Sequence, residues 1–311
     1  MKAVFLDRGS FPQDIEIDLT GLVSEYVEFH NTSEDKVLQR IAEADIVLTN
    51  KVVLSAETVK QAHKLKLIQV MATGTNNVPM QTCQELGIKV QNVEGYSKIS
   101  VPEHTFAMLL ALRRNLLSYI TDVKAGDWSQ SEFFCMMDYP IRDLASSTMA
   151  IIGSGQLGQQ VAILAKAFGM QVIFAERKQA KNIREGYMAF EEAIQQADIV
   201  SLHCPLTEET RNLVSTREFD LMPSHALLIN MSRGGIVDES ALVEAIQKNQ
   251  IAGAAFDVSV VEPMPSSSPL NQLNQNPNFL LTPHIAWASE GAMRELVKLA
   301  IAHISHFVKH Q

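Results

Sequence analysis

Four residues that can bind substrates or move protons follow short apolar runs in the second half of the sequence: Arg233, Asp257, Glu262 and His284. Where such runs are parallel strands, their carboxyl ends meet at one edge of a sheet, and ligands bind there. Several charged or titratable side chains at one edge are typical of a catalytic cleft. We therefore expect these four side chains to converge.

These residue types suit the reduction of a 2-keto acid, which needs a carboxylate anchor, an electrophile at the carbonyl oxygen and a proton donor. Arg233 carries a planar, permanently charged fork of N–H donors that can bind both groups. His284 can protonate the developing alkoxide, and Glu262 can accept from the other imidazole nitrogen. Each residue alone has an ordinary structural explanation, so the prediction of Arg233, Glu262 and His284 as catalytic residues depends on their joint occurrence.

A glycine-rich segment, G-S-G-Q-L-G at 153–158, lies between an apolar run and apolar residues at helical spacing. In such a turn Gly153 reverses the chain, Gly155 lets a pyrophosphate approach the backbone, and Gly158 lets the helix lie close to the strand. The next apolar run ends at Glu176, which can accept hydrogen bonds from ribose hydroxyls. A glycine turn without a ligand is the alternative. The pattern predicts a nicotinamide dinucleotide, which supplies the hydride.

The elements that position these residues alternate apolar runs with helical patterns, as in parallel sheets covered by helices. Between two such series lie a nearly all-apolar helix over 101–114, expected to be buried between domains or at a subunit contact, and an irregular aromatic-rich arm over 119–147. The arm either covers a partner subunit or packs on its own domain. The amphipathic helix 290–308 is expected to return to the first domain. Strands are predicted at 4–6, 23–29, 45–48, 67–71, 89–93, 149–152, 172–175, 199–203, 226–230, 252–256 and 279–281.

The first half of the chain has no phosphate loop, and its informative stretch is 71–77, directly after a predicted strand. Backbone N–H groups around Gly74 are suited to hold a carboxylate. An ordinary polar turn explains the same residues equally well, so both interpretations stay open.

Composition limits the classes of function. The 311 residues suffice for about two domains, and 46% of them are hydrophobic. A net charge of −9 without a basic cluster argues against nucleic acid and anionic membranes as partners. The uncharged apolar run 106–112 is too short to span a bilayer. An early acid, Asp7, argues against a signal peptide, so we expect a cytoplasmic protein.

The remaining cysteines and histidines predict no metal site. The cysteines form no C-x-x-C pair and are far apart, which indicates neither a zinc site nor a disulfide framework. Three histidines near the end lie opposite the apolar stripe of the last predicted helix, as on a solvated face. The residues are Cys83, Cys135, Cys204, His303, His306 and His310.

With these motifs, the sequence resembles the D-isomer-specific 2-hydroxyacid dehydrogenases over essentially its whole length, most closely the glycerate dehydrogenase (hydroxypyruvate reductase) branch. The closer likeness rests on residues 72–78, 128–135, 138–142 and 284–287. The resemblance implies an α/β fold with two doubly wound parallel-sheet domains. A Rossmann-type NAD-binding domain, 101–286, is inserted in a flavodoxin-like substrate domain made of 1–100 and 287–311. It also implies a homodimer.

The resemblance further implies roles for single residues. Arg233, Glu262 and His284 are the catalytic residues, with His284 as proton donor. Gly74 and Thr75 bind the substrate carboxylate through backbone N–H groups, together with Arg233 and His284. The implied cofactor site consists of Thr73, Gly153, Gly155, Gln156, Leu157, Gly158, Glu176, Cys204, Met231, Arg233, Asp257 and His284.

The expected cofactor is NAD, because the Glu176 carboxylate would repel the 2′-phosphate of NADP; Arg177 and Lys178 could pair with that phosphate, which keeps NADP as the alternative. The expected reaction is reduction of hydroxypyruvate to D-glycerate, with glyoxylate as a second substrate. The alternatives are a dehydrogenase for another small D-2-hydroxy acid, or a dinucleotide-sensing protein like the corepressors that share this fold and keep the same three residues.

Overall fold

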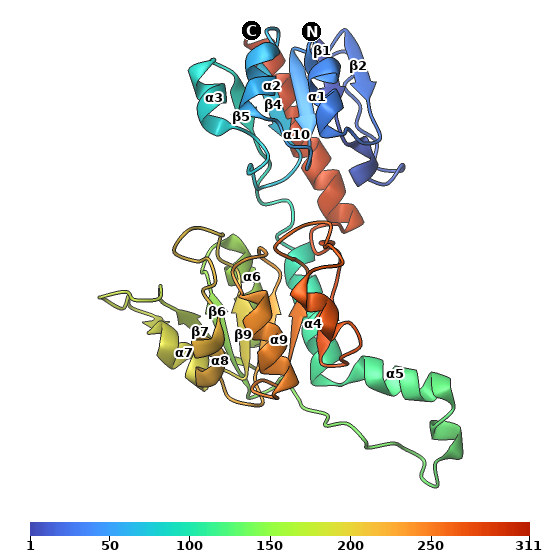
Figure 1. Ribbon diagram of the computed structural model, residues 1–311, viewed down its shortest axis with the longest axis vertical. Helices are drawn as coiled ribbons and strands as arrows, with labels where there is room; N and C mark the ends of the chain where they lie inside the picture. The colour runs from blue at the N-terminus through green and yellow to red at the C-terminus, as the bar shows by residue number, and fades with distance from the viewer. The chain divides into compact units, whose positions relative to one another are not determined.

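The computed structural model describes residues 1–311 and divides them into two compact units (Figure 1). Unit 1 consists of Met1–Ser97 and Ala288–Gln311, and unit 2 is Lys98–Trp287. Each unit contains one wholly parallel sheet, of five and seven strands respectively. The α/β class with two doubly wound sheets is therefore confirmed.

Unit 1 has the strand order β2-β1-β3-β4-β5, which is the flavodoxin-like order 2-1-3-4-5. Its central strands are β-branched and buried on both faces, as parallel strands covered by helices must be. The strands are β1 (Lys2–Phe5), β2 (Glu25–Glu28), β3 (Ile46–Thr49), β4 (Leu67–Val70) and β5 (Lys89–Gln91). The helices are α1 (Glu34–Ile41), α2 (Ala56–Gln61), α3 (Met80–Glu85) and α10 (Glu290–Lys309), with a 3-10 turn at Arg8–Ser10.

The last helix, α10, belongs to unit 1 although the sequence of unit 2 precedes it. Ser289 begins the helix by accepting a hydrogen bond from the Ala292 N–H at 3.2 Å. The apolar stripe predicted for this helix is its buried face, apart from the half-buried Ile301. Its buried residues are Ala292, Met293, Leu296, Val297, Ala300, Ile304 and Phe307.

Unit 2 has the strand order β12-β11-β10-β9-β6-β7-β8. Numbered from its first strand, this is the Rossmann order 3-2-1-4-5-6 with one more strand, and the order reverses between β6 and β9. The strands are β6 (Thr148–Ile152), β7 (Gln171–Ala175), β8 (Tyr187–Met188), β9 (Ile199–Leu202), β10 (Leu227–Asn230), β11 (Gly253–Phe256) and β12 (Phe279–Leu281). The helices are α4 (Ser100–Arg113), α5 (Leu116–Ala125), α6 (Gln156–Ala167), α7 (Phe190–Gln196), α8 (Thr216–Leu221) and α9 (Glu239–Gln247). Short 3-10 turns occupy Trp128–Gln130 and Pro269–Leu273.

The all-apolar helix α4 packs in the core of unit 2, and its expected contact with a second domain or a subunit stays a prediction. Phe106 and Leu109 of α4 share one apolar cluster with Met149 and Ile151 of β6 and with Val161 of α6. A helix that covers a sheet on one side and another helix on the other needs apolar residues around most of its circumference.

The arm after α4 begins with a helix rather than the predicted irregular chain. Asn115, with a φ of 47°, ends α4, and α5 then runs to Gly126, whose φ of 94° closes it. Beyond α5 the tip of the arm extends away from the sheet of unit 2 (Figure 1), where Phe133 and Phe134 are 72% and 91% exposed. The end of the arm returns to its own domain, where Leu144 is buried in the apolar cluster of unit 2. None of the helices in the molecule combines the length and apolarity needed to cross a membrane.

Candidate active site

The glycine-rich turn connects β6 to α6 as predicted. Gly153 has a φ of 101°, and a Cβ there would lie 2.6 Å from the Cys204 nitrogen. A Cβ on Gly158 would lie 2.0 Å from the Gly153 carbonyl oxygen, so helix and strand approach at a distance that only glycine allows. A Cβ on Gly155 would meet open space.

These residues fit the pyrophosphate of a dinucleotide. No side chain caps the first turn of α6, so no capping side chain occupies the backbone N–H groups of this turn, which include those of Gln156 and Leu157. An uncapped helix start of this kind offers N–H donors and a partial positive charge to an anion. The chemistry of the donor set therefore matches the group that the sequence predicts.

Glu176 follows β7 as predicted, but its carboxylate is fully engaged. One oxygen accepts from the Arg177 N–H at 2.8 Å and from Arg184 Nη2 at 2.9 Å. The other accepts from Arg184 Nε at 2.6 Å and from the Arg184 N–H at 3.3 Å. The Arg184 side chain, followed by the Arg177 N–H, lowers the pKa of Glu176 to about 2. A carboxylate accepts about four hydrogen bonds, so Glu176 has no further acceptor position in this arrangement.

Arg184 also connects the end of β7 to the glycine-rich turn. Its guanidinium carbon lies 3.8 Å from the centre of the Tyr187 ring, a cation–π contact. The Tyr187 hydroxyl donates to Ser154 Oγ at 2.5 Å. Sequence reasoning missed Arg184 and Tyr187 because they lie in a polar stretch without hydrophobic periodicity. The only available signal was a run of basic residues after the acid that ends β7.

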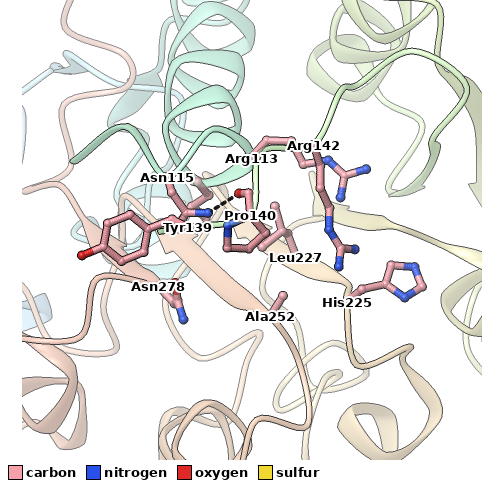
Figure 2. Close-up of a pocket in the computed structure, with 10 residues that line it drawn as sticks. Arg113, Asn115, Tyr139, Pro140, Arg142, His225, Leu227, Ala252 and Asn278 are labelled. Carbon is pink, nitrogen blue, oxygen red and sulfur yellow. Dashed lines mark hydrogen bonds between the residues drawn. The ribbon is translucent and has the colours of Figure 1, made fainter. Parts of the chain in front are cut away.

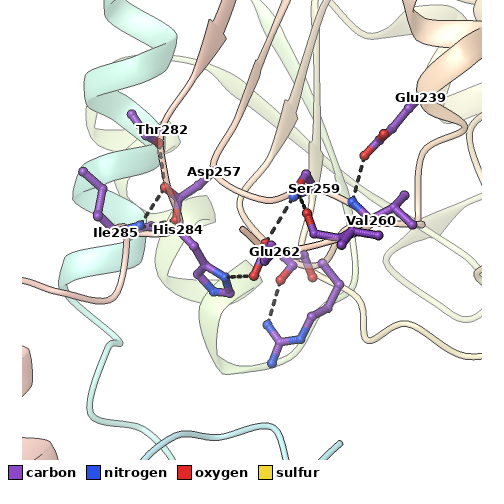
Figure 3. Close-up of polar contacts among 12 residues, drawn as sticks. Glu239, Asp257, Ser259, Val260, Glu262, Thr282, His284 and Ile285 are labelled. Atoms are coloured by element: carbon purple, nitrogen blue, oxygen red, sulfur yellow. Dashed lines mark hydrogen bonds and ion pairs between the residues drawn. The ribbon is translucent and has the colours of Figure 1, made fainter. Parts of the chain in front are cut away.

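Glu262 and His284 form a hydrogen-bonded pair beyond the ends of β11 and β12 (Figure 3). His284 Nδ1 lies 2.6 Å from one Glu262 carboxylate oxygen, and the other oxygen accepts from the Ser259 N–H at 3.1 Å. Both side chains are partly exposed, at 25% and 34%. His284 has a φ of 57°, a left-handed conformation that is uncommon outside glycine and is often found at functional sites. The predicted contact between the two side chains is confirmed.

Asp257 holds the loop that carries His284 (Figure 3). The carboxylate is 1% exposed. It accepts from the Thr282 hydroxyl at 2.6 Å and from the N–H groups of Ile285 and Ala286 at 2.9 and 2.8 Å. His104 of α4 contacts the same Thr282 hydroxyl at 3.0 Å. Asp257 is thus a positioning residue for the loop that carries the imidazole.

Arg233 lies in the loop after β10, the strand next to β11. Asn230 fixes this loop by donating to the Arg233 carbonyl at 3.0 Å and accepting from the Ser232 N–H at 3.1 Å. A Cβ on Gly234 would lie 1.9 Å from the Ser259 carbonyl oxygen, so the arginine loop packs directly on the loop that leads to Glu262. The three predicted catalytic residues therefore follow three adjacent strands, and their loops are in contact.

The other predicted cofactor residues of unit 2 line the same edge. Met231 is buried, and the Cys204 carbonyl accepts from the Ser232 hydroxyl at 2.5 Å. Burial raises the pKa of the Cys204 thiol to about 11 and lowers the pKa of the neighbouring His203 to about 4. Both side chains are therefore neutral near pH 7, and neither is suited to act as a nucleophile or a charged ligand.

The predicted substrate loop lies in unit 1, after β4. The Thr73 hydroxyl donates to the Val93 carbonyl at 3.0 Å, and the Asn92 amide donates to the Thr73 carbonyl at 2.7 Å. The Thr75 carbonyl accepts from the Val78 N–H at 3.0 Å, which closes a turn over 75–78, directly after Gly74. The binding of a substrate carboxylate by Gly74 and Thr75 stays a prediction.

The strand order, the glycine-rich turn at its switch point and the acid–imidazole pair define a dinucleotide-dependent oxidoreductase. Residues 106–286 match the NAD binding domain of the D-isomer specific 2-hydroxyacid dehydrogenases. The chain belongs to this family and is an NAD(P)-dependent 2-keto acid reductase. It is 39% identical to the glycerate dehydrogenase of Methylorubrum extorquens, over 99% of this chain and 96% of that protein.

Two solved structures share the whole fold. The D-lactate dehydrogenase of Aquifex aeolicus, complexed with NAD and lactic acid, has a TM-score of 0.84 at 27% identity, covering 99% of this chain and 96% of that one. An acyclic imino acid reductase in complex with NADPH and D-arginine has a TM-score of 0.86 at 26% identity, covering 100% and 98%.

Proposed function

We propose that this enzyme reduces hydroxypyruvate to D-glycerate, and glyoxylate to glycolate as a second reaction. The observation that carries the chemistry is the 2.6 Å contact between His284 and Glu262, beside the loop of Arg233. The choice of hydroxypyruvate is supported by the glycerate dehydrogenase relative at 39% identity. NADH, when bound, supplies the hydride.

Arg233 binds the substrate in this proposal. One of its nitrogens donates to the Ser232 carbonyl at 2.7 Å, which anchors the side chain at the base of the loop. A guanidinium has five N–H donors, so the others remain for the substrate carboxylate and keto oxygen. The permanent charge also polarises the carbonyl and stabilises the developing alkoxide.

His284 donates the proton. Its Nδ1 faces the Glu262 carboxylate, which leaves Nε2 for the substrate oxygen. The carboxylate stabilises the imidazolium before transfer and keeps the ring oriented during transfer, while the Ser259 N–H and Asp257 hold the two loops in place. After transfer the neutral imidazole retains its Nδ1 proton and its hydrogen bond to Glu262.

For the cofactor, we propose that NADH is preferred and that Arg184 limits this preference. The Glu176 carboxylate disfavours a 2′-phosphate by repulsion, but Arg184 compensates its charge at 2.6 Å. Binding of the ribose hydroxyls requires Arg184 to release at least one oxygen of Glu176. The same guanidinium, once released, is available to a 2′-phosphate.

We also propose a homodimer formed through the arm. Trp128, Phe133, Phe134 and Met137 are all at least half exposed, and a monomer rarely leaves so many large apolar side chains in one segment. Sedimentation velocity of the wild type and of the double variant F133S/F134S tests this: the wild type sediments as a dimer and the variant as a monomer. A monomeric wild type would contradict it.

The central experiment measures steady-state kinetics by NADH absorbance with hydroxypyruvate, glyoxylate, pyruvate and phenylpyruvate, each with NADH and NADPH. We expect the highest kcat/KM for hydroxypyruvate with NADH. A higher kcat/KM for another keto acid would contradict hydroxypyruvate as the preferred substrate, but it would not contradict the proposed reduction. No turnover of any substrate would favour the dinucleotide-sensing alternative.

A further inference from the structure

A cavity lies at the amino edge of the seven-stranded sheet, the edge opposite the catalytic loops (Figure 2). It has a volume of about 250 Å³. The beginnings of β10, β11 and β12 form its floor, at Leu227, Ala252 and Asn278. The end of α4 and the returning arm form its walls, and two arginines and a histidine contribute the cationic and titratable groups: Arg113, Arg142 and His225.

Arg113 is the unusual residue of this cavity. It is 7% exposed, its buried Nε has no partner, and its side chain forms neither a hydrogen bond nor an ion pair. Burial lowers the pKa of the guanidinium, and the nearby charge of Arg142 lowers it further. Arginine nevertheless stays protonated in proteins, so a largely buried positive charge stands here without an ion-pair partner.

Asp198, the acid with the larger influence on Arg113, is already engaged elsewhere. Asp198 accepts from the Thr148 N–H at 2.8 Å with one oxygen, and its other oxygen lies 3.0 Å from His225 Nε2. Its charge acts on Arg113 only through space, as does that of Asp143, which pairs with Arg114 at 2.9 Å. Arg142 contacts Arg113 through the backbone, where its N–H donates to the Arg113 carbonyl at 3.1 Å, and its own side chain has no hydrogen-bond partner. Two guanidinium groups therefore face one cavity with their donors free.

We propose that this cavity binds a small free anion, a phosphate or a carboxylate, between Arg113 and Arg142. A buried charge without a partner destabilises the folded protein. An anion that accepts hydrogen bonds from both guanidinium groups removes this destabilisation. Guanidinium geometry matches the paired oxygens of phosphates and carboxylates. The cavity volume accommodates an anion of this size, and the site is separate from the catalytic residues, which lie beyond the opposite strand ends.

Inorganic phosphate is the probe for the test. It is titrated calorimetrically into the wild type, R113M and R114M at constant ionic strength in a chloride-free buffer. Arg114 is the matched control, because it is the next residue, carries the same charge and pairs with Asp143 at 2.9 Å outside the cavity. We expect equal affinities for the wild type and R114M, and an affinity at least tenfold lower for R113M. Phosphate bound by the glycine-rich turn contributes equally to all three proteins.

Equal affinities in all three proteins would mean an adventitious ion only and would overturn the proposal. If R113M does not fold, R142M replaces it, since Arg142 is exposed and its side chain supports no other contact. Sedimentation velocity with and without phosphate tests the other source of an anion. If phosphate dissociates a dimer of the wild type and R113M is monomeric, the cavity holds an acidic side chain of a second copy, and the free-anion proposal is wrong.

Discussion

At the carboxyl edge of the seven-stranded sheet the acidic and titratable side chains are paired, whereas at the amino edge the Arg113 guanidinium has no partner. Glu262 lies 2.6 Å from His284, and Glu176 lies 2.6 Å from Arg184. Asp257 accepts from two backbone N–H groups and a hydroxyl. The carboxyl edge is thus organised by pairs within the protein, whereas the Arg113 guanidinium at the amino edge is not.

This difference separates two uses of charge. Paired charges at the catalytic edge fix the orientation of the groups that react, since preorganised partners need not rearrange during the reaction. The unpaired arginine at the opposite edge orients nothing in the protein and is available to a ligand. Substitutions at the first edge should therefore change turnover or cofactor choice, and a substitution at the second should leave turnover unchanged.

The largest expected effect is that of H284A. Removal of a general acid lowers kcat by about 10²–10⁴-fold, and the cofactor affinity should change little, because the glycine-rich turn is remote from this side chain along the sheet. Single-turnover kinetics with hydroxypyruvate and fluorescence titration with NADH separate the two quantities. Unchanged turnover would remove His284 from the catalytic residues.

E262Q should have a smaller effect on turnover. A hydrogen bond to a charged group contributes about 1.5–3 kcal/mol, so kcat falls roughly 10- to 100-fold. An imidazolium beside a neutral amide loses its proton more readily, so the alkaline limit of the reduction moves to lower pH. E262D keeps the charge and should restore the wild-type limit. A pH–rate profile that is identical for E262Q and the wild type would show that the contact does not operate in catalysis.

The sequence was sufficient for the parts of the site that depend on strand ends. Arg233, Glu262 and His284 follow apolar runs, and parallel strands bring such positions to one edge regardless of side-chain detail. The glycine-rich turn was predictable for a different reason. Only glycine tolerates the close approach of Gly158 to the Gly153 carbonyl, so the residue type itself indicates the turn.

Other features depend on contacts that no local pattern encodes. The packing of α4 in the core of unit 2 was not predicted, because an all-apolar helix packs equally well on a sheet, a domain or a subunit. The partner of Glu176 was missed because Arg184 lies eight residues later, in a polar stretch whose return to Glu176 no sequence pattern indicates. Arg113 was missed because its residue type is ordinary at the end of a helix and only the structure shows it buried and unpaired.

R184M tests the cofactor side of the catalytic edge. Without the guanidinium the Glu176 carboxylate is uncompensated, so we expect the ratio of kcat/KM for NADH over NADPH to rise roughly fivefold, the scale of a partly exposed ion pair. The variant should also lose stability in a pH-dependent way. A lowered pKa of Glu176, about 2 against an ordinary 4.5, stabilises the fold above pH 4.5 and loses this effect as the pH falls toward 2.

Urea unfolding at pH 6, 5 and 4 measures this. The difference in unfolding free energy between the wild type and R184M should shrink as the pH falls. R217M is the control, because Arg217 pairs with Glu191 at 2.6 Å on an exposed surface of the same unit. A cofactor ratio that is the same in R184M and the wild type would contradict the proposed role of Arg184.

R113M should have the smallest effect on turnover. It should also be more stable than the wild type, whereas R184M should be less stable. Removal of one partner from a buried pair destabilises a protein because it leaves a charge uncompensated. Arg113 is already uncompensated, so its replacement by an apolar side chain of similar length should raise the free energy of unfolding by about 1 kcal/mol in anion-free buffer. The value of kcat should stay within about twofold of the wild type, as expected for a site outside the catalytic loops.

R114M is again the control, because Arg114 is the exposed neighbour of Arg113. This variant breaks a surface ion pair and should change the free energy of unfolding by less than about 0.5 kcal/mol. Added phosphate should stabilise the wild type and R114M more than R113M, because binding to the folded state alone raises its stability. The order of the two arginine variants should therefore reverse between anion-free and phosphate buffers. If R113M is instead less stable than R114M in both, Arg113 has a structural partner in solution, and the contrast between the two edges of the sheet does not hold.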